Sequence, residues 1–212
     1  VVYRTRHDVY PVVDGSGAPR GGAGPRPLLV VLHGDRQRAA AAATRWRAAA
    51  RDRGWVLLAL ACPTALGCGE SWWQWNGDPA WIAEQVAAVE RTVELDPTRR
   101  YLAGWSGGAT YLGMHAAVWS ATFAAVVVHG GGHPPEAACP DPALPAYFLV
   151  GDRNPLHALA VDLRAWFEGC RAELVWDLVR GGDHDREDRA LDGKKARAIL
   201  DWLADHARTA TR

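Results

Sequence analysis

The sequence lacks a long hydrophobic run and an excess of charge of either sign. No apolar segment of the 212 residues reaches the ~18–20 residues that a membrane-spanning helix needs. Lysine plus arginine and aspartate plus glutamate number 24 each, so no basic stripe is available to bind nucleic acid or an anionic membrane. We therefore expect neither a membrane nor a nucleic acid as a partner.

The sequence also lacks the two-plus-two ligand spacing of a zinc site. His129, His133 and Cys139 lie near one another in the chain, but the glycines and prolines around them are typical of a loop. We expect no metal at this cluster and no cofactor.

Cysteine is scarce, with four residues in the chain. An even number is typical of disulfides in exported proteins, and four cysteines allow three pairings. Loop positions favour Cys62–Cys68 and Cys139–Cys170, and the alternative is four reduced thiols. On this parity we favour an exported protein slightly over a cytoplasmic one.

Apolar residues make up 49% of the chain, which is typical of a globular protein. The length suits one domain, and we find no repeat, linker or low-complexity tract. We therefore expect a single domain over residues 1–212. The sequence does not indicate an oligomeric state.

Strands and helices are predicted to alternate along most of the chain. Residues 1–13 are expected to form one or two edge strands, and residues 14–27 a glycine- and proline-rich loop. Buried strands are then predicted at residues 28–32, 55–61, 100–103, 123–128, 146–150 and 173–178. Helices are predicted at residues 39–53, at 79–95 with Asp96-Pro97 as its stop, from 107 to about 119, at 156–168 and around 196–203. This order indicates an α/β protein with a mostly parallel central sheet flanked by helices.

A Gly104-Trp105-Ser106-Gly107-Gly108 motif follows a predicted strand and opens a predicted helix. A sharp strand-to-helix turn lifts a serine hydroxyl above the sheet, and it tolerates only small neighbours. We therefore predict Ser106 as a nucleophile and the Gly107 N–H as an oxyanion donor. The alternative is an ordinary glycine-rich turn with a capping serine.

The segment His33-Gly34-Asp35 ends the first central strand. In a hydrolase this loop supplies a second oxyanion donor, so we predict the main-chain N–H of Asp35 for that role. Taken alone, the segment fits an ordinary strand-ending turn equally well.

His184 follows the last predicted strand in a glycine-containing loop, where it can reach the serine hydroxyl as a general base. The third member of the triad should follow residues 146–150. Asn154 occupies the position expected for its carboxylate, and Asp152 is the nearest acidic residue. We favour Asp152 over Asn154, with Asp183, Asp185 and Glu136 as less well placed candidates.

Three tryptophans, Trp72, Trp73 and Trp75, lie in the loop after residues 55–61. At the carboxyl end of a central strand they are predicted to contact substrate, and Trp105 in the serine motif is assigned to the same group. The alternative is that most of the 11 tryptophans pack the core. Only 17 residues separate Val128 from Ala146, which is too few for a lid domain.

In their order along the chain, these motifs resemble the esterases of the α/β-hydrolase superfamily. The branch most similar is that of polyhydroxybutyrate depolymerase-like and feruloyl esterase-like enzymes, and the resemblance covers roughly residues 25 to 205. The motifs that carry it are Leu32-His33-Gly34-Asp35, the tryptophan loop, Asp96-Pro97, Gly104 to Gly108 and Gly181 to His184. The resemblance implies an α/β-hydrolase fold and ester hydrolysis through an acyl-enzyme. It also implies an acid after residue 150, where Asn154 departs from the pattern.

We therefore predict a serine esterase that acts on a small-molecule or polymeric ester. A catalytically weakened or non-catalytic binding protein is the first alternative, and Asn154 is the residue that suggests it. An acyltransferase or a peptidase that uses the same residues is the second alternative.

Overall fold

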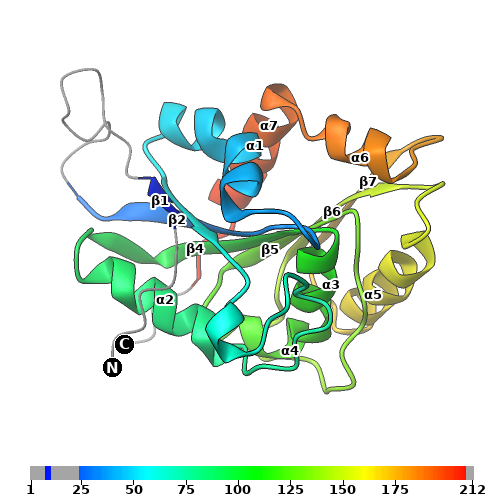
Figure 1. Cartoon of the computed structure of the whole chain (residues 1–212), viewed down its shortest axis with the longest axis horizontal. Coiled ribbons are helices and arrows are strands. Elements are labelled where there is room, and N and C mark those ends of the chain that lie inside the picture. Colours follow the sequence, from blue (N-terminus) through cyan, green and yellow to red (C-terminus); the bar gives the residue numbers. More distant parts are fainter. Residues whose placement is uncertain (1–7, 11–23, 209–212) are drawn as a thin grey trace.

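The computed structural model describes residues 8–10 and 24–208, which form one seven-stranded sheet between two layers of helices (Figure 1). The strand order is β1-β3-β2-β4-β5-β6-β7. All neighbouring strands are parallel except β1, which pairs antiparallel with β3 at one edge. This arrangement confirms the predicted α/β-hydrolase fold with a mostly parallel sheet.

The strands are β1 (Asp8–Tyr10), β2 (Arg26–Leu32), β3 (Val56–Leu60), β4 (Leu95–Trp105), β5 (Ala125–His129), β6 (Ala146–Gly151) and β7 (Leu174–Val179). The helices are α1 (Ala39–Asp52), α2 (Ala80–Glu90), α3 (Gly107–Met114), α4 (Ala116–Trp119), α5 (His157–Gly169), α6 (His184–Ala190) and α7 (Gly193–Ala204), and a short 3₁₀ turn, η1 (Thr64–Leu66), follows β3.

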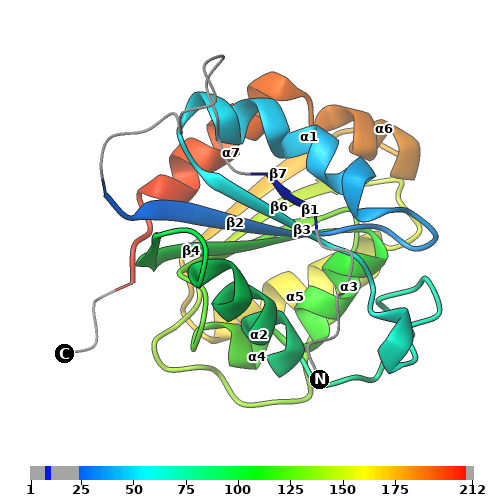
Figure 2. The ribbon, with the colours of Figure 1, turned by 60° about the vertical axis from the view of Figure 1, so that its left-hand side comes forward.

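The helices divide between the two faces of the sheet, as Figures 1 and 2 show. Helices α1, α6 and α7 cover one face, and α2, α3, α4 and α5 cover the other. The central strands β2, β3, β5 and β6 are buried along their length, which explains why they appear in the sequence as continuous apolar runs. Two apolar cores result, one on each face.

Three predicted boundaries were wrong. Helix α2 ends at Glu90, so the prediction of a helix to residue 95 is too long. Asp96-Pro97 does not stop a helix but lies near the start of β4, which begins at Leu95 because Leu95 pairs with Arg26 of β2. The helix after Ser106 is interrupted at His115, whose backbone (φ −111°, ψ 16°) separates α3 from α4.

Two further differences concern the loops. The predicted loop 14–27 is shorter than expected, because β2 already begins at Arg26, and its residues 14–23 lie outside the described residues. Of the predicted edge strands in residues 1–13, β1 is described and the rest lies outside the described residues. His184 was expected in a flexible loop, but it begins helix α6.

Both favoured disulfides are present, Cys62–Cys68 in the loop after β3 and Cys139–Cys170 between the β5–β6 connection and the end of α5. None of the helices in residues 24–208 is long and apolar enough to cross a membrane. Export stays a prediction.

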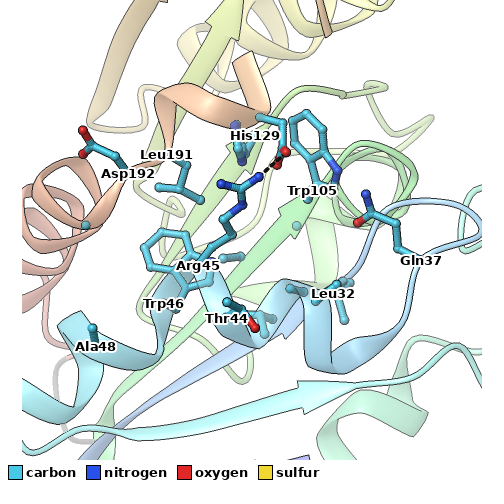
Figure 3. Close-up of a pocket in the computed structure, with 17 residues that line it drawn as sticks. Leu32, Gln37, Thr44, Arg45, Trp46, Ala48, Trp105, His129, Leu191 and Asp192 are labelled. Atoms are coloured by element: carbon cyan, nitrogen blue, oxygen red, sulfur yellow. Dashed lines mark hydrogen bonds and ion pairs between the residues drawn. The ribbon is translucent and has the colours of Figure 1, made fainter. Parts of the chain in front are cut away.

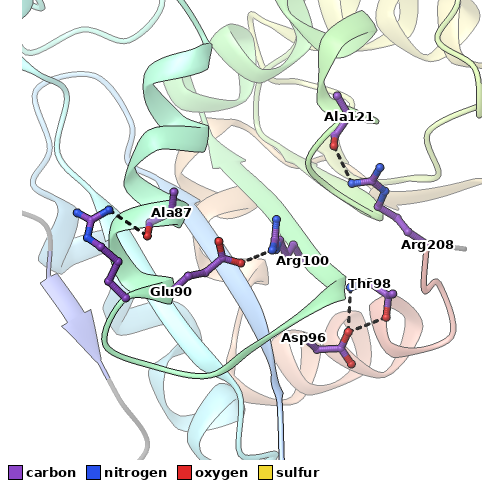
Figure 4. Close-up of polar contacts among 8 residues, drawn as sticks. Ala87, Glu90, Asp96, Thr98, Arg100, Ala121 and Arg208 are labelled. Carbon is purple, nitrogen blue, oxygen red and sulfur yellow. Dashed lines mark hydrogen bonds and ion pairs between the residues drawn. The ribbon is translucent and has the colours of Figure 1, made fainter. Parts of the chain in front are cut away.

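The amino end of β4 is fixed to its surroundings by charged contacts (Figure 4). Arg100 forms an ion pair with Glu90 of α2, and Asp96 accepts hydrogen bonds from the N–H and the hydroxyl of Thr98 (2.8 and 2.6 Å). Near the end of the described chain, Arg208 donates from its main chain to the Thr98 carbonyl (2.8 Å). These contacts lie at the end of β4 that is remote from Ser106.

Candidate active site

Ser106 lies at the turn between β4 and α3, with left-handed backbone angles (φ 51°, ψ −116°). Such angles are costly for a residue other than glycine and are found mostly at functional sites. The turn tolerates only small neighbours: a Cβ on Gly104 would lie 2.5 Å from the Gly108 carbonyl oxygen, and one on Gly108 would lie 2.6 Å from the His33 carbonyl oxygen. The glycines of the motif are therefore required by close backbone packing around the serine.

Asp35 and Gly107, the two predicted oxyanion donors, lie side by side. Leu32 pairs with Gly104 in adjacent parallel strands, so the loops after β2 and β4 leave the sheet at the same level. A Cβ on Gly107 would overlap Asp35 Oδ1, which places the Asp35 carboxylate directly against Gly107. The structure thus brings together the two segments that the sequence analysis assigned to the oxyanion site.

His33 fixes the start of this loop. Its Nε2 accepts the Cys62 N–H at 3.0 Å, and its Nδ1 is 2.7 Å from the Gly34 carbonyl oxygen, so the neutral ring carries its proton on Nδ1. Burial lowers the pKa of His33, which keeps the ring neutral. The buried ring therefore ties the end of β2 to the end of β3 and holds the Asp35 segment in place.

His184 is the first residue of α6, whose N-cap Asp183 accepts the Arg186 N–H at 2.8 Å. The imidazole stacks on the indole of Trp105, the residue before Ser106, with ring centroids 4.5 Å apart and planes 15° apart. Burial lowers the pKa of His184, although Asp185, Asp188 and Asp183 oppose this effect. A neutral imidazole next to the serine turn is the state that a general base requires.

Asn154, not Asp152, lies against the candidate base. The side-chain nitrogen Nδ2 of Asn154 is 3.0 Å from His184 Nδ1, and Asn154 is 6% exposed. Asp152 is exposed, and no contact joins it to His184 among the described residues. The sequence-based preference for Asp152 therefore does not match the geometry, because the turn after β6 directs residue 154 inward and residue 152 toward solvent.

The orientation of the Asn154 amide follows from its other contacts. Its Oδ1 accepts the Leu156 N–H at 2.9 Å, so Nδ2 must point to the opposite side. There it meets the Gly130 carbonyl oxygen (3.3 Å), the Glu187 carboxylate and His184 Nδ1. The amide therefore presents N–H groups, not an acceptor, to the candidate base.

Glu187 is a buried carboxylate that the sequence analysis missed. It lies on α6 one turn after His184, it is fully buried, and its Oε2 accepts a hydrogen bond from Asn154 Nδ2. Burial raises the pKa of Glu187 to about 7, although hydrogen bonds from Asn154 and from the backbone of Gly151 and Gly130 oppose this effect. Residues three apart on a helix lie on one face, so the spacing of His184 and Glu187 would have placed them together if a helix had been predicted there.

His129, at the end of β5, is also buried against this cluster. Its Nε2 donates to the Glu187 main-chain carbonyl at 3.0 Å, and its ring contacts Trp105 with centroids 4.3 Å apart. Burial lowers the pKa of His129 to about 3, so the ring is neutral over the physiological range. His129 thus packs against both α6 and Trp105.

The tryptophans predicted to bind substrate divide into two groups. Trp72 and Trp75 are buried and pack against Trp81 and Tyr111, so they belong to the core. Trp73 is 42% exposed. Trp105 contacts the candidate base directly, as described above.

Two cavities lie near these residues. One, of about 550 Å³, is on the α1 and α6 face, where an ion pair between Arg45 and Asp188 crosses it (Figure 3). Trp105 and His129 line this cavity, whereas Ser106 and His184 do not. The other, of about 400 Å³, lies between the loop after β2 and the tryptophan loop and is lined by Asp35.

Among the described residues, no group of three or more acidic, histidine or cysteine side chains could hold a metal ion.

The fold and this arrangement of residues define the class of α/β hydrolases, and comparisons with solved structures agree. A thermostable esterase superposes with a TM-score of 0.74 at 15% identity, over 95% of this chain and 59% of that one, so the chain spans about three fifths of that esterase. An S-formylglutathione hydrolase from Agrobacterium tumefaciens superposes with a TM-score of 0.70 at 14% identity, over 95% of this chain and 90% of that one. The fluorophosphonate-binding serine hydrolase F of Staphylococcus aureus superposes with a TM-score of 0.66 at 17% identity, over 93% of this chain and 91% of that one.

The model of the family "Esterase PHB depolymerase" matches residues 16–177, most of the chain. The chain belongs to this esterase family, as the resemblance in its motifs predicted. No curated protein matches it in sequence.

Proposed function

We propose that this protein hydrolyses carboxylic esters through an acyl-enzyme on Ser106, with His184 as general base. The observation that carries the proposal is the strained Ser106 turn, whose preceding residue, Trp105, stacks on the His184 imidazole. A binding protein has no need of a serine in that conformation next to a base. Membership in an esterase family supports the same reaction class.

The proposed steps assign one role to each of the groups described above. His184 takes the Ser106 hydroxyl proton while the serine oxygen attacks the ester carbonyl. The Gly107 and Asp35 N–H groups stabilise the negative oxygen of the tetrahedral intermediate. The alcohol leaves with the proton from His184, and water then releases the acid in the same way. No step requires a cofactor.

Asn154 makes this a slow enzyme. A carboxylate on His184 Nδ1 would accept a proton there and would stabilise the imidazolium ion. The Asn154 amide instead presents Nδ2, which favours the tautomer with the proton on Nε2 and disfavours proton uptake from serine. Exchange of the triad aspartate for asparagine costs about 10⁴ in rate in a serine protease.

The test is hydrolysis of short p-nitrophenyl esters by the wild-type protein and by Ser106→Ala. A complete triad contributes about 2 × 10⁶ to kcat, so after a loss of about 10⁴ at the acid position Ser106 retains about a hundredfold. We expect Ser106→Ala to lower kcat by that factor. Ser120→Ala, at a buried serine behind α4, is the control for the loss of a serine hydroxyl and should hydrolyse at the wild-type rate.

The Asn154 geometry also favours a second candidate, a binding protein that retains the hydrolase fold. The two candidates differ in the reactivity of Ser106 toward a fluorophosphonate probe. Labelling that is lost in Ser106→Ala supports the esterase. Equal background hydrolysis in all variants, with no labelling of Ser106, would leave only the binding protein.

A further inference from the structure

Trp105, the last residue of β4, contacts two histidines. It pairs with His129 of β5 in the sheet, and its indole packs against the rings of both His129 and His184 (Figure 3). Alternate residues of a strand point to the same face, so Trp105 follows Tyr101 and Ala103 toward the layer of α1, α6 and α7. The strand thus directs the indole at the helix that begins with the candidate base.

Two backbone segments fix the place of the indole. A Cβ on Gly34 would lie 2.7 Å from Trp105 Cδ1, and a Cβ on Gly130 would lie 2.2 Å from Trp105 Cζ3. Gly130 also has a left-handed backbone (φ 67°), which glycine adopts without strain. The loops after β2 and β5 therefore enclose the indole closely, and its orientation is set by the fold and not by a substrate.

The stacking geometry suits a positively charged imidazole. The ring centroids of Trp105 and His184 are 4.5 Å apart and the ring planes are 15° apart, so the imidazole lies over the face of the indole. That face is the negative part of the indole quadrupole, and a cation within about 6 Å of the centroid is attracted to it. A general base becomes such a cation when it takes the proton of the nucleophile.

The groups buried near His184 do little to stabilise this charge. Asn154 presents N–H groups to Nδ1, and Glu187 beside it keeps its proton up to about pH 7, because burial raises its pKa to about 7. His129 is neutral, because burial lowers its pKa to about 3. Below pH 7, this cluster offers the imidazolium ion no carboxylate.

The charges of α6 act on His184 without being bound to it. Asp183, Asp185 and Asp188 all favour the charged ring. However, Asp183 caps the helix, Asp188 forms an ion pair with Arg45, and Asp185 is exposed. Solvent and salt screen such attraction, whereas the indole face meets the ring directly.

We propose that Trp105 is a positioning residue for the general base: its indole face holds the His184 imidazole and stabilises the imidazolium ion, in part replacing the carboxylate that Asn154 lacks. The inference rests on the proposed esterase function and adds a determinant of its rate. It gives Trp105 a role different from the substrate contact predicted from the sequence.

The direct readout is the pKa of His184, measured by NMR from the pH dependence of its imidazole resonances, with His184→Gln to assign them. Loss of a cation–π contact and loss of burial change this pKa in opposite directions. We expect Trp105→Leu to lower it by about half a unit to one unit, because the charged ring loses its partner. An indole that only shielded the ring from water would give the reverse, a higher pKa in Trp105→Leu.

The kinetic readout separates positioning from substrate contact. Hydrolysis of p-nitrophenyl acetate and of trifluoroethyl acetate is measured with Ser106→Ala as the blank. We expect Trp105→Leu to lower kcat about three- to tenfold for both esters with KM unchanged, since the lost interaction exists only in the transition state. Trp105→Phe keeps an aromatic face and should lose less. Stacking of the indole on the substrate would instead raise KM for the aryl ester alone.

Trp202 offers a matched control. It is a second partly buried tryptophan in contact with a histidine, His206, with ring centroids 4.1 Å apart near the end of α7. Trp202→Leu therefore makes the same exchange at a tryptophan–histidine contact outside the candidate site. It should leave both kcat and the pKa of His184 at the wild-type values.

The outcomes are distinct. With Ser106-dependent hydrolysis present, an unchanged or raised pKa of His184 in Trp105→Leu, or a kcat equal to that of the wild type, overturns the role of Trp105 and leaves the esterase standing. If Trp105→Leu does not fold, Trp105→Phe decides the question, with a smaller fall of the same pKa expected. Absence of Ser106-dependent hydrolysis in the wild type overturns the proposed function and the role of Trp105 with it.

Discussion

The two ends of strand β4 differ in how their charged and candidate catalytic groups are paired. At the amino end, Arg100 pairs with Glu90, and Asp96 accepts from Thr98 and Arg99. Burial alone would raise the pKa of Asp96, but the hydrogen bonds from Thr98 and Arg99 outweigh it and lower this pKa. The charges of Arg100 and Asp96 are therefore paired within the protein, although the buried Arg100 Nε and Tyr101 hydroxyl have no partner among the described residues.

At the carboxyl end, several polar groups lack a suitable partner. Ser106 is held in a strained conformation, Asp35 Oδ1 is buried and unpaired among the described residues, and His184 Nδ1 faces an amide nitrogen. A protein tolerates such groups where a substrate supplies the missing interaction, and stability is provided elsewhere. The amino end of β4 thus anchors the strand, and the carboxyl end is available for chemistry.

The largest effect should come from giving His184 a carboxylate. Asn154→Asp places an acceptor 3.0 Å from Nδ1, and the Leu156 N–H still binds the other oxygen. The new carboxylate also meets Glu187, and two adjacent carboxylates share one proton, so Glu187 stays protonated and donates. We expect kcat for p-nitrophenyl esters to rise by up to about 10⁴.

The double variant Asn154→Asp with Glu187→Gln sharpens this result. The glutamine amide at position 187 can donate to the new carboxylate at position 154 without titrating, so the gain should persist at alkaline pH, where the single variant loses part of it. Asp152→Asn is the matched control, since it makes the reverse exchange two residues away, and it should change nothing. A loss of activity in Asp152→Asn with no gain in Asn154→Asp would identify Asp152 as the acid in spite of its exposure.

The same contrast explains which parts of the site could be predicted from the sequence. The serine turn is determined locally, by a strand followed by a five-residue motif of three glycines, a tryptophan and the serine. The structure has this turn where the motif predicts it. The Asp35 loop follows from the end of a buried strand in the same way. In both cases the pattern and the constraint lie within one short segment.

The acid side depends on contacts between distant segments, and there the sequence left Asp152 and Asn154 as alternatives and did not indicate Glu187. Glu187 meets Asn154 across 33 residues, and neither residue indicates this contact in its own neighbourhood. The preference for Asp152 relied on charge type, whereas the turn after β6 decides which side chain points inward. Trp72 and Trp75 were predicted to contact substrate, with core packing as the alternative, and their packing against Tyr111 of α3 favours the alternative.

A second, smaller effect concerns the pH dependence of stability. The pKa of Glu187 is raised to about 7 in the folded protein, so between its unfolded value near 4.5 and 7 the folded state keeps a proton that the unfolded state releases. Stability therefore falls as pH rises through this window, by roughly 3 kcal/mol at 1.36 kcal/mol per pKa unit. Glu187→Gln does not titrate and should be free of this loss.

Urea unfolding of both proteins at pH 5 and pH 8 measures the effect. The variant should gain roughly 3 kcal/mol relative to the wild type between the two pH values. His129, with its pKa lowered to about 3, makes stability fall as pH drops below 6.5, but it does so in both proteins and cancels in the difference. An identical difference at pH 5 and pH 8 would mean that Glu187 is ionised in the folded protein throughout.

The smallest effect should come from the amino end of β4. Glu90→Gln removes the charge that pairs with Arg100 and keeps the shape of the side chain. Because the pair is partly exposed, screening by solvent limits its contribution, and we expect a loss of at most about 1 kcal/mol that disappears at high salt. Urea unfolding with and without 1 M NaCl measures this loss of stability, because the electrostatic screening length falls to about 3 Å at 1 M salt.

Glu90→Gln also tests whether the two ends of β4 are independent of each other. Ester hydrolysis by Glu90→Gln should equal that of the wild type, because the pair lies at the far end of the strand from Ser106. Glu84→Gln, an exposed position on the same helix α2, controls for the loss of a negative charge from that surface. If Glu90→Gln lowered kcat tenfold while Glu84→Gln did not, the amino end of β4 would contribute to the position of Ser106, and the two ends of the strand would act as one unit.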